Sequence, residues 1–129
     1  MSTTRVLIAD DHEAVRRGLR SVLEENSELK VIGEAVNGEE AVEQVQRLKP
    51  DLVILDLSMP ILDGLAAARE IKKLSPGTPI VVFSMHKIKE FVDMAKRIGL
   101  RGYVAKEDNS DTLLEAVDAV LHNLTYFPG

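Results

Sequence analysis

Three aspartates follow short apolar runs, at places where their carboxylates could meet in the folded chain. Asp10 and Asp11 come directly after the run 6–9, and Asp56 comes directly after the run 53–55. Carboxylates held close together repel one another, which costs folding free energy. Hard cations such as Mg²⁺ prefer oxygen ligands of this kind, and a carboxylate can attack phosphorus to form an aspartyl phosphate. The spacing therefore indicates a metal-dependent phosphoryl-transfer site with Asp56 as the nucleophile.

Two further polar residues end apolar runs of the same kind. Ser84 follows the run 80–83, and Lys106 follows the run 102–105. A lysine ammonium makes a point-charge contact with phosphate oxygens, and a serine hydroxyl can donate a hydrogen bond to a new phosphoryl group. Phosphoryl transfer depends on positioning and charge neutralisation more than on acid–base groups. A cation together with Lys106 would therefore be sufficient support for the nucleophile.

The elements that must position these residues alternate regularly along the chain. Each short β-rich run is followed by an amphipathic helical pattern. The first, third and fourth runs are continuously apolar. The expected strands are 6–9, 30–36, 52–55, 80–83 and 102–105, and the expected helices are 13–25, a segment capped by Asn37 that ends before Pro50, 64–74, 88–98 and a segment capped by Ser110 that reaches 121. Continuously apolar strands with right-handed crossovers predict a doubly wound parallel α/β sheet, with the more polar run 30–36 near an edge. Ligands bind at the carboxyl ends of the strands in such sheets, where all five polar residues fall.

The composition is that of one globular domain. The chain has 129 residues, of which 45% are hydrophobic and 29% charged, a typical balance for a compact soluble domain. A formal net charge of -5 argues against direct binding of nucleic acid, which usually needs a basic face. The absence of cysteine excludes disulfides, thiolate catalysis and cysteine zinc sites, and it fits a reducing cytosol.

The sequence also bounds the organisation and location of the chain. No apolar run approaches the ~20 residues of a membrane-spanning helix, and the polar N-terminus lacks the apolar core of a signal peptide. We expect one domain over residues 1–122, with 123–129 as a frayed tail or the start of a linker. We expect a cytoplasmic location and no contact with a membrane.

The same positions resemble the receiver domain of bacterial two-component response regulators. The resemblance rests on Ile8-Ala9-Asp10-Asp11-His12, on Leu55-Asp56-Leu57-Ser58-Met59-Pro60 with Asp63-Gly64, on Ser84, on Gly99-Leu100-Arg101-Gly102-Tyr103 and on Lys106. It covers essentially the whole chain, and the stretch 102–108 resembles the group whose receivers precede a helix-turn-helix DNA-binding domain. The implied fold is a single (βα)5 flavodoxin-like domain with the parallel sheet order 2-1-3-4-5.

That resemblance implies a role for each acidic residue of the site. Asp56 would accept a phosphoryl group from the phosphohistidine of a sensor histidine kinase. Asp11 and Asp56, with the backbone carbonyl of Ser58, would hold Mg²⁺, for which Mn²⁺ could substitute. Asp10 would assist directly or through a water molecule. The chain would then be a signalling switch that catalyses only its own phosphotransfer and dephosphorylation, and not an enzyme acting on other substrates.

The resemblance also implies a switch pair and a set of flanking side chains. Phosphate would draw Ser84 inward, and Tyr103 would turn its ring into the space so vacated, which would change the surface of the fourth helix, fifth strand and fifth helix. Taken alone, Tyr103 would more often be half-buried packing. The residues expected to flank the site are Met59, Met85 and His86.

Two positions depart from the usual receiver pattern. Glu107 stands where a proline commonly follows the lysine, often in a cis bond, so the conformation of the Lys106–Glu107 bond stays open. Met85 stands where alanine is frequent, and its larger side chain would narrow the access of water to the phosphoryl group.

The sequence lacks residues that other functional classes would need. A haloacid-dehalogenase-type phosphohydrolase would need a second aspartate where Ser58 stands, and a flavin-binding module would need a Ser/Thr/Gly-rich loop where the acidic segment 10–13 stands. The complete acidic site argues against a degenerate receiver. Two readings of the output stay open. The chain is either the regulatory part of a transcriptional regulator, with a phosphorylation-dependent homodimer through the first and fifth helices and DNA contact only by an absent domain, or a stand-alone receiver that acts by protein–protein contact.

Overall fold

A five-stranded parallel sheet with helices on both faces forms the protein. The computed structural model describes residues 3–59, 63–85 and 87–128. The sheet order is β2-β1-β3-β4-β5, as predicted. The elements in chain order are β1 (Thr4–Ala9), α1 (Glu13–Leu23), β2 (Leu29–Ala35), α2 (Gly38–Leu48), β3 (Leu52–Leu55), α3 (Gly64–Leu74), β4 (Ile80–Ser84), α4 (Lys89–Ile98), β5 (Gly102–Ala105) and α5 (Ser110–Leu121).

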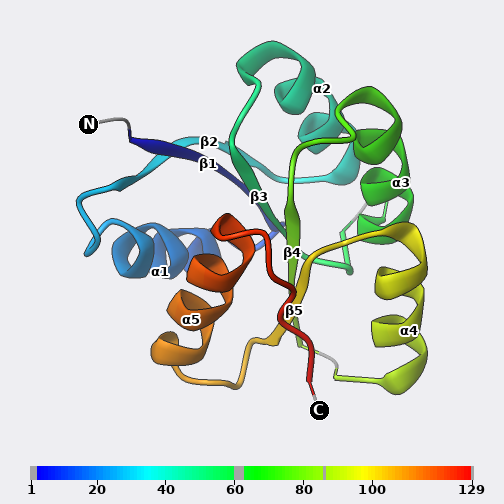
Figure 1. Ribbon diagram of the computed structural model, residues 1–129. Helices are drawn as coiled ribbons and strands as arrows, with labels where there is room; N and C mark the ends of the chain where they lie inside the picture. The colour runs from blue at the N-terminus through cyan, green and yellow to red at the C-terminus, as the bar shows by residue number, and fades with distance from the viewer. Residues whose placement is uncertain (1–2, 60–62, 86, 129) are drawn as a thin grey trace.

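The helices divide between the two faces of the sheet. Figure 1 shows α1 and α5 on one face and α2, α3 and α4 on the other. Side chains of β1 alternate between the faces: Leu7 packs with α2, α3 and α4, whereas Val6 and Ile8 pack with α1 and α5. All three are completely buried. Burial of both faces explains why the central strands have continuous apolar sequences and why β2, at the edge, is more polar.

Asparagine side chains cap the start of α2 and of α5. Asn37 accepts a hydrogen bond from the backbone N–H of Glu40 at 2.8 Å, as expected for the start of α2. The prediction that Ser110 caps α5 was wrong. The cap is Asn109, whose side chain accepts from the backbone N–H of Thr112 at 3.0 Å. The amide oxygen of Asn109 reaches the third residue of the helix, so the helix begins one residue earlier than expected.

The segment after α5 returns to the open edge of the sheet. Tyr126 lies beside Gly102 in a short parallel bridge. Its carbonyl accepts from the backbone N–H of Tyr103 at 2.8 Å, and its own N–H donates to the carbonyl of Arg101 at 2.9 Å. The ammonium of Lys96 lies 5.2 Å from the centre of the Phe127 ring. The described part of this tail therefore covers β5 and is not frayed.

Candidate functional site

The predicted polar residues meet at the carboxyl edge of the sheet because neighbouring strands end there together. The backbone N–H of Asp56 donates to the carbonyl of Ala9 at 2.9 Å, so Asp10 and Asp56 follow hydrogen-bonded strands. The backbone N–H of Lys106 likewise donates to the carbonyl of Ser84 at 2.7 Å. Asp10, Asp56 and Ser84 are buried, with at most 3% of each exposed. Polar side chains at, or directly after, the ends of four strands therefore lie along one edge of the sheet.

Lys106 is the cation that holds the buried acids together. Its Nζ lies 2.7 Å from Oδ2 of Asp10 and 3.5 Å from Oδ2 of Asp56, and only 9% of its side chain is exposed. Because water is largely excluded, these attractions are much stronger than those of a surface ion pair. Lys106 therefore offsets part of the repulsion between the two carboxylates.

The remaining repulsion is visible in the ionisation of Asp56. Burial raises the pKa of this carboxyl, and the nearby Asp10 carboxylate raises it further. The ammonium of Lys106 and the backbone N–H of Ser58, which lies 3.4 Å from Oδ1 of Asp56, act in the opposite direction without cancelling the rise. Ionisation of Asp56 in the folded protein therefore costs free energy, and a bound cation would offset that cost.

This cost predicts that Asp56→Asn stabilises the metal-free protein at neutral pH. A carboxyl with a raised pKa in the folded state binds its proton more readily folded than unfolded. Its destabilising effect is therefore full above the raised pKa and disappears as pH falls through that value toward the unfolded value of about 3.9. Urea unfolding in EDTA at a series of pH values should show a gain for the variant that shrinks at lower pH. If Asp56→Asn were no more stable than wild type at neutral pH, ionised Asp56 would not be destabilising as argued.

A metal ion fits among the acidic side chains. Ligand atoms of Asp10, Asp11, His12 and Asp56 all lie within 4.8 Å of one another. Oδ2 of Asp10 is buried and has no hydrogen-bond partner in the described part of the chain, apart from its ion pair with Lys106. Nδ1 of His12 lies 3.0 Å from Oδ1 of Asp11, so His12 touches the cluster from its exposed side. The donor set, dominated by carboxylate oxygens, suits a hard divalent cation.

Ser84 and Tyr103 are both buried and lie next to each other on the neighbouring strands β4 and β5. The side chains of Ser84 and Tyr103 are hydrogen-bonded to each other. Tyr103 is 1% exposed and belongs to the core on the side of α2, α3 and α4. Burial raises the pKa of its phenol, and the hydrogen bond with Ser84 opposes the rise. The Tyr103 ring is therefore buried in this structure, and its inward turn in response to phosphorylation stays a prediction.

The flanking residues are distributed unevenly around the site. Met59 is buried, whereas Met85 is 66% exposed, so most of the Met85 side chain lies in solvent. Pro60 and His86, which were expected in the loops beside the site, lie outside the described residues. No peptide bond between described residues is cis, so the Lys106–Glu107 bond is trans.

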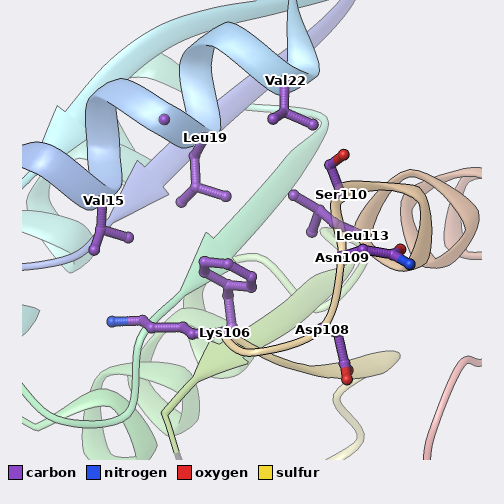
Figure 2. A pocket seen from close by; sticks show the side chains of 10 residues that line it. Val15, Leu19, Val22, Lys106, Asp108, Asn109, Ser110 and Leu113 are labelled. Carbon is purple, nitrogen blue, oxygen red and sulfur yellow. The ribbon is translucent and has the colours of Figure 1, made fainter.

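An apolar cavity adjoins the site but is separate from the acidic cluster. It has a volume of about 270 Å³ and lies between α1 and α5, lined mainly by Val15, Leu19, Val22, Phe83 and Leu113. Lys106 contributes to its wall, and in Figure 2 the nitrogen of Lys106 points away from Ser110 and Leu113. The ammonium of Lys106 therefore contacts the carboxylates, and its aliphatic stem faces the cavity.

Sequence reasoning missed Arg16, which contacts the site, and Glu34, which contacts Arg16. Arg16, on α1, donates from Nη1 to the carbonyl of Asp10 at 2.8 Å and from Nε to Glu34 on β2 at 2.9 Å. The available signal was a glutamate one residue before the end of β2, together with an arginine one turn after His12. A pairing between residues 18 positions apart leaves no local pattern.

Comparison with known proteins identifies a family whose model matches most of the chain. The sequence matches the response regulator receiver domain model over residues 6–118. The transcriptional regulatory protein YdfI of Bacillus subtilis is 38% identical over 117 residues, which cover 91% of this chain and 54% of that protein. A protein-glutamate methylesterase/protein-glutamine glutaminase of Methanococcoides burtonii is 40% identical over 104 residues, 79% of this chain and 29% of that protein. The chain thus spans about half of the first relative and under a third of the second.

Solved structures show the same fold. A two-component response regulator of the LuxR family from Aurantimonas sp. SI85-9A1 superposes with a TM-score of 0.93 at 33% identity, covering 97% of this chain and 89% of that one. The isolated receiver domain of RcsB from Salmonella enterica serovar Typhimurium, solved with the phosphomimetic BeF3-, gives a TM-score of 0.91 at 28% identity, with 98% and 94% covered. In the described segments of this chain, no helix combines the length and apolarity required to cross a bilayer.

Proposed function

The chain belongs to the response regulator receiver domain family, and we propose on that basis that Asp56 accepts a phosphoryl group from the phosphohistidine of a sensor histidine kinase. The observation that carries this proposal is the position of Lys106, whose Nζ lies within 3.5 Å of Asp56 and 2.7 Å of Asp10. Three carboxylates and one ammonium at the end of a parallel sheet are suited to phosphoryl transfer, which needs charge neutralisation above all.

The chemistry follows from the buried carboxylate. An oxygen of Asp56 forms a bond to phosphorus while the bond from phosphorus to the imidazole nitrogen breaks, and the electron pair stays with the imidazole. A bound Mg²⁺ would neutralise charge on the phosphoryl oxygens. Asp11, Asp56 and the carbonyl of Ser58 would hold it, with Asp10 assisting directly or through water, and Mn²⁺ could replace it. Lys106 orients Asp56 before the reaction and would contact a phosphoryl oxygen afterwards.

The conformational response would begin at Ser84. Its hydroxyl, now bonded to Tyr103, would donate instead to the phosphoryl group. Tyr103 shares the core with α4 and is bonded through its backbone to the tail, so a change at Ser84 would alter the face formed by α4, β5 and α5. Phosphorylation, a local change of charge, would thereby shift the equilibrium between two conformations of this surface.

We propose that this surface controls a larger protein. Relatives named as transcriptional regulators are about twice the length of the match, which supports a regulatory part whose DNA contact is made by a further domain. Phosphorylation would then promote a homodimer through α1 and α5. Light scattering with and without beryllofluoride tests this dimerisation, and an unchanged monomer would count against it.

The alternative is a stand-alone receiver that acts by protein–protein contact. We propose no methylesterase activity for this domain, because the match leaves most of that relative uncovered. We also propose a cytoplasmic location for the domain.

A small phosphodonor tests the proposed function without knowledge of the kinase. The chain is incubated with acetyl phosphate or phosphoramidate, with Mg²⁺ in one sample and EDTA in the other, and its intact mass is measured. We expect the mass of one added phosphoryl group with Mg²⁺ and an unmodified chain with EDTA. An unmodified chain in both samples, with a known receiver modified under the same conditions, would overturn the proposal.

A further inference from the structure

We propose that Arg16 is a positioning residue for the cation site, because it fixes the backbone carbonyl of Asp10 and with it the peptide that leads to Asp11. The inference rests on the proposed function, since it concerns residues that would hold the cation. Arg16 does not touch the reacting atoms, and its effect is transmitted through the backbone of the loop between β1 and α1.

The contacts of Arg16 tie that loop to the edge of the sheet. Its Nη1 donates to the carbonyl of Asp10 at 2.8 Å, and its Nε donates to Oε1 of Glu34 at 2.9 Å. Only 13% of the side chain is exposed. The guanidinium thus bridges two acceptors with donors in a fixed planar geometry, which a lysine ammonium does not reproduce.

Glu34 in turn is held from several sides. Its Oε2 accepts from Nε and Nη2 of Arg20 at 3.1 and 2.9 Å, and its backbone carbonyl accepts from the side chain of Gln44 on α2 at 2.9 Å. Burial raises the pKa of Glu34, but hydrogen bonds from Arg20 and Arg16 outweigh burial and hold that pKa below its usual value. Glu34 is therefore an ionised anchor that orients the guanidinium of Arg16.

The loop needs such an anchor because its side chains repel one another. Asp10 and Asp11 are adjacent, and Asp56 shares the same small volume. Two further bonds hold Asp10: its backbone N–H donates to the carbonyl of Ala35 at 3.0 Å, and its Oδ1 accepts from the backbone N–H of His12 at 2.9 Å. Without Arg16 the peptide between Asp10 and Asp11 could rotate to separate the carboxylates. Partners of metal ligands commonly change metal affinity about tenfold to a hundredfold when removed.

The test compares Mg²⁺ affinity among matched arginine variants of the whole chain. The dissociation constant for Mg²⁺ is measured by isothermal titration calorimetry, and the free energy of unfolding is measured separately in urea. Arg17 is the control, because it is the next residue on α1, is 73% exposed and pairs only with Glu13 of its own helix among the described residues. We expect Arg16→Ala to weaken Mg²⁺ binding about tenfold or more, Glu34→Gln to weaken it to a smaller extent, and Arg17→Ala to leave it unchanged.

A second readout separates positioning from charge and from general stability. Arg16→Lys keeps the charge but not the fork, so it should bind Mg²⁺ nearly as weakly as Arg16→Ala. In phosphorylation by phosphoramidate, the Mg²⁺ concentration for half-maximal rate should rise in both variants while the rate at saturating Mg²⁺ stays near that of wild type. Wild-type affinity in folded Arg16→Ala, or full rescue by Arg16→Lys, would overturn the inference. If Arg16→Ala does not fold, Arg16→Lys and Glu34→Gln decide. A wild-type chain that binds no Mg²⁺ would instead refute the proposed function.

Discussion

Gly64→Ala should destabilise the protein by about 3 kcal/mol, at the upper end of the cost of overpacking a well-packed site. Gly64 is the first residue of α3, and its backbone N–H donates to the carbonyl of Leu57 at 3.0 Å. A Cβ at this position would lie 2.6 Å from Cα of Leu57 and 2.9 Å from the carbonyl carbon of Asp56, and it would also collide with the carbonyl oxygen of Asp56. All three are backbone atoms, so no side chain can move aside.

The consequence would reach the acceptor itself. To admit the methyl group, either α3 or the backbone of Asp56 and Leu57 must shift, and such a shift would move the Asp56 carboxylate relative to Lys106. We therefore expect a lower phosphorylation rate in the folded fraction as well as a lower midpoint of urea unfolding. Gly18→Ala is the control, because Gly18 lies within α1 and a Cβ there meets no atom within 4 Å. That change should stabilise the protein by about 0.5–1 kcal/mol. Equal effects of the two changes would contradict the close approach.

Lys106→Met should lower stability at neutral pH without metal by about 3 kcal/mol, the cost of breaking a buried ion pair on one side. Methionine keeps the apolar stem that lines the cavity but removes the charge. Asp10 and Asp56 would then face each other, buried, without the ammonium that now lies 2.7 and 3.5 Å from them. Millimolar Mg²⁺ or a lower pH should restore much of the loss, because either one neutralises the carboxylates.

The same substitution should slow phosphorylation of Asp56 by about a hundredfold, as expected when a preorganised charge contact to the transferred group is removed. Lys89→Met provides the control. Lys89 is 84% exposed and pairs with Asp93 on the surface at 2.8 Å, and exposed pairs contribute little. Urea unfolding in EDTA and in Mg²⁺, with the phosphorylation rate by intact mass, measures both effects. A stability loss in Lys106→Met that Mg²⁺ leaves unchanged would argue against the charge explanation.

The sheet and the identity of its carboxyl edge could be predicted from the sequence because both depend on local pattern. Apolar runs of strand length ended at Ala9, Leu55 and Ala105, and the structure ends its strands at the same residues. Each run is followed by a charged side chain, so parallel pairing alone brings those charges together. Asn37 was identifiable as a helix cap because it precedes an amphipathic pattern with Glu40 three residues later.

The remaining details depend on contacts between distant segments. Asn109 and Ser110 are both favourable caps, and only the path of the chain from β5 decides between them. The Asp63-Gly64 pair belongs to the receiver resemblance, but the approach of Gly64 to the backbone of Asp56 depends on how α3 docks. The clamp formed by Arg16 and Glu34 joins α1 to β2 and has no signature in either segment alone.

The most direct measurement of the central claim is the position of the phosphoryl group after reaction with phosphoramidate and Mg²⁺. An acyl phosphate on an aspartate is reduced by borohydride to homoserine, which peptide mass spectrometry locates in the sequence. The account predicts homoserine at position 56 in the wild-type chain, and none at positions 10 and 11 or in Asp56→Asn. Homoserine at position 10 or 11, or an equal yield of phosphorylated chain in Asp56→Asn, would contradict it.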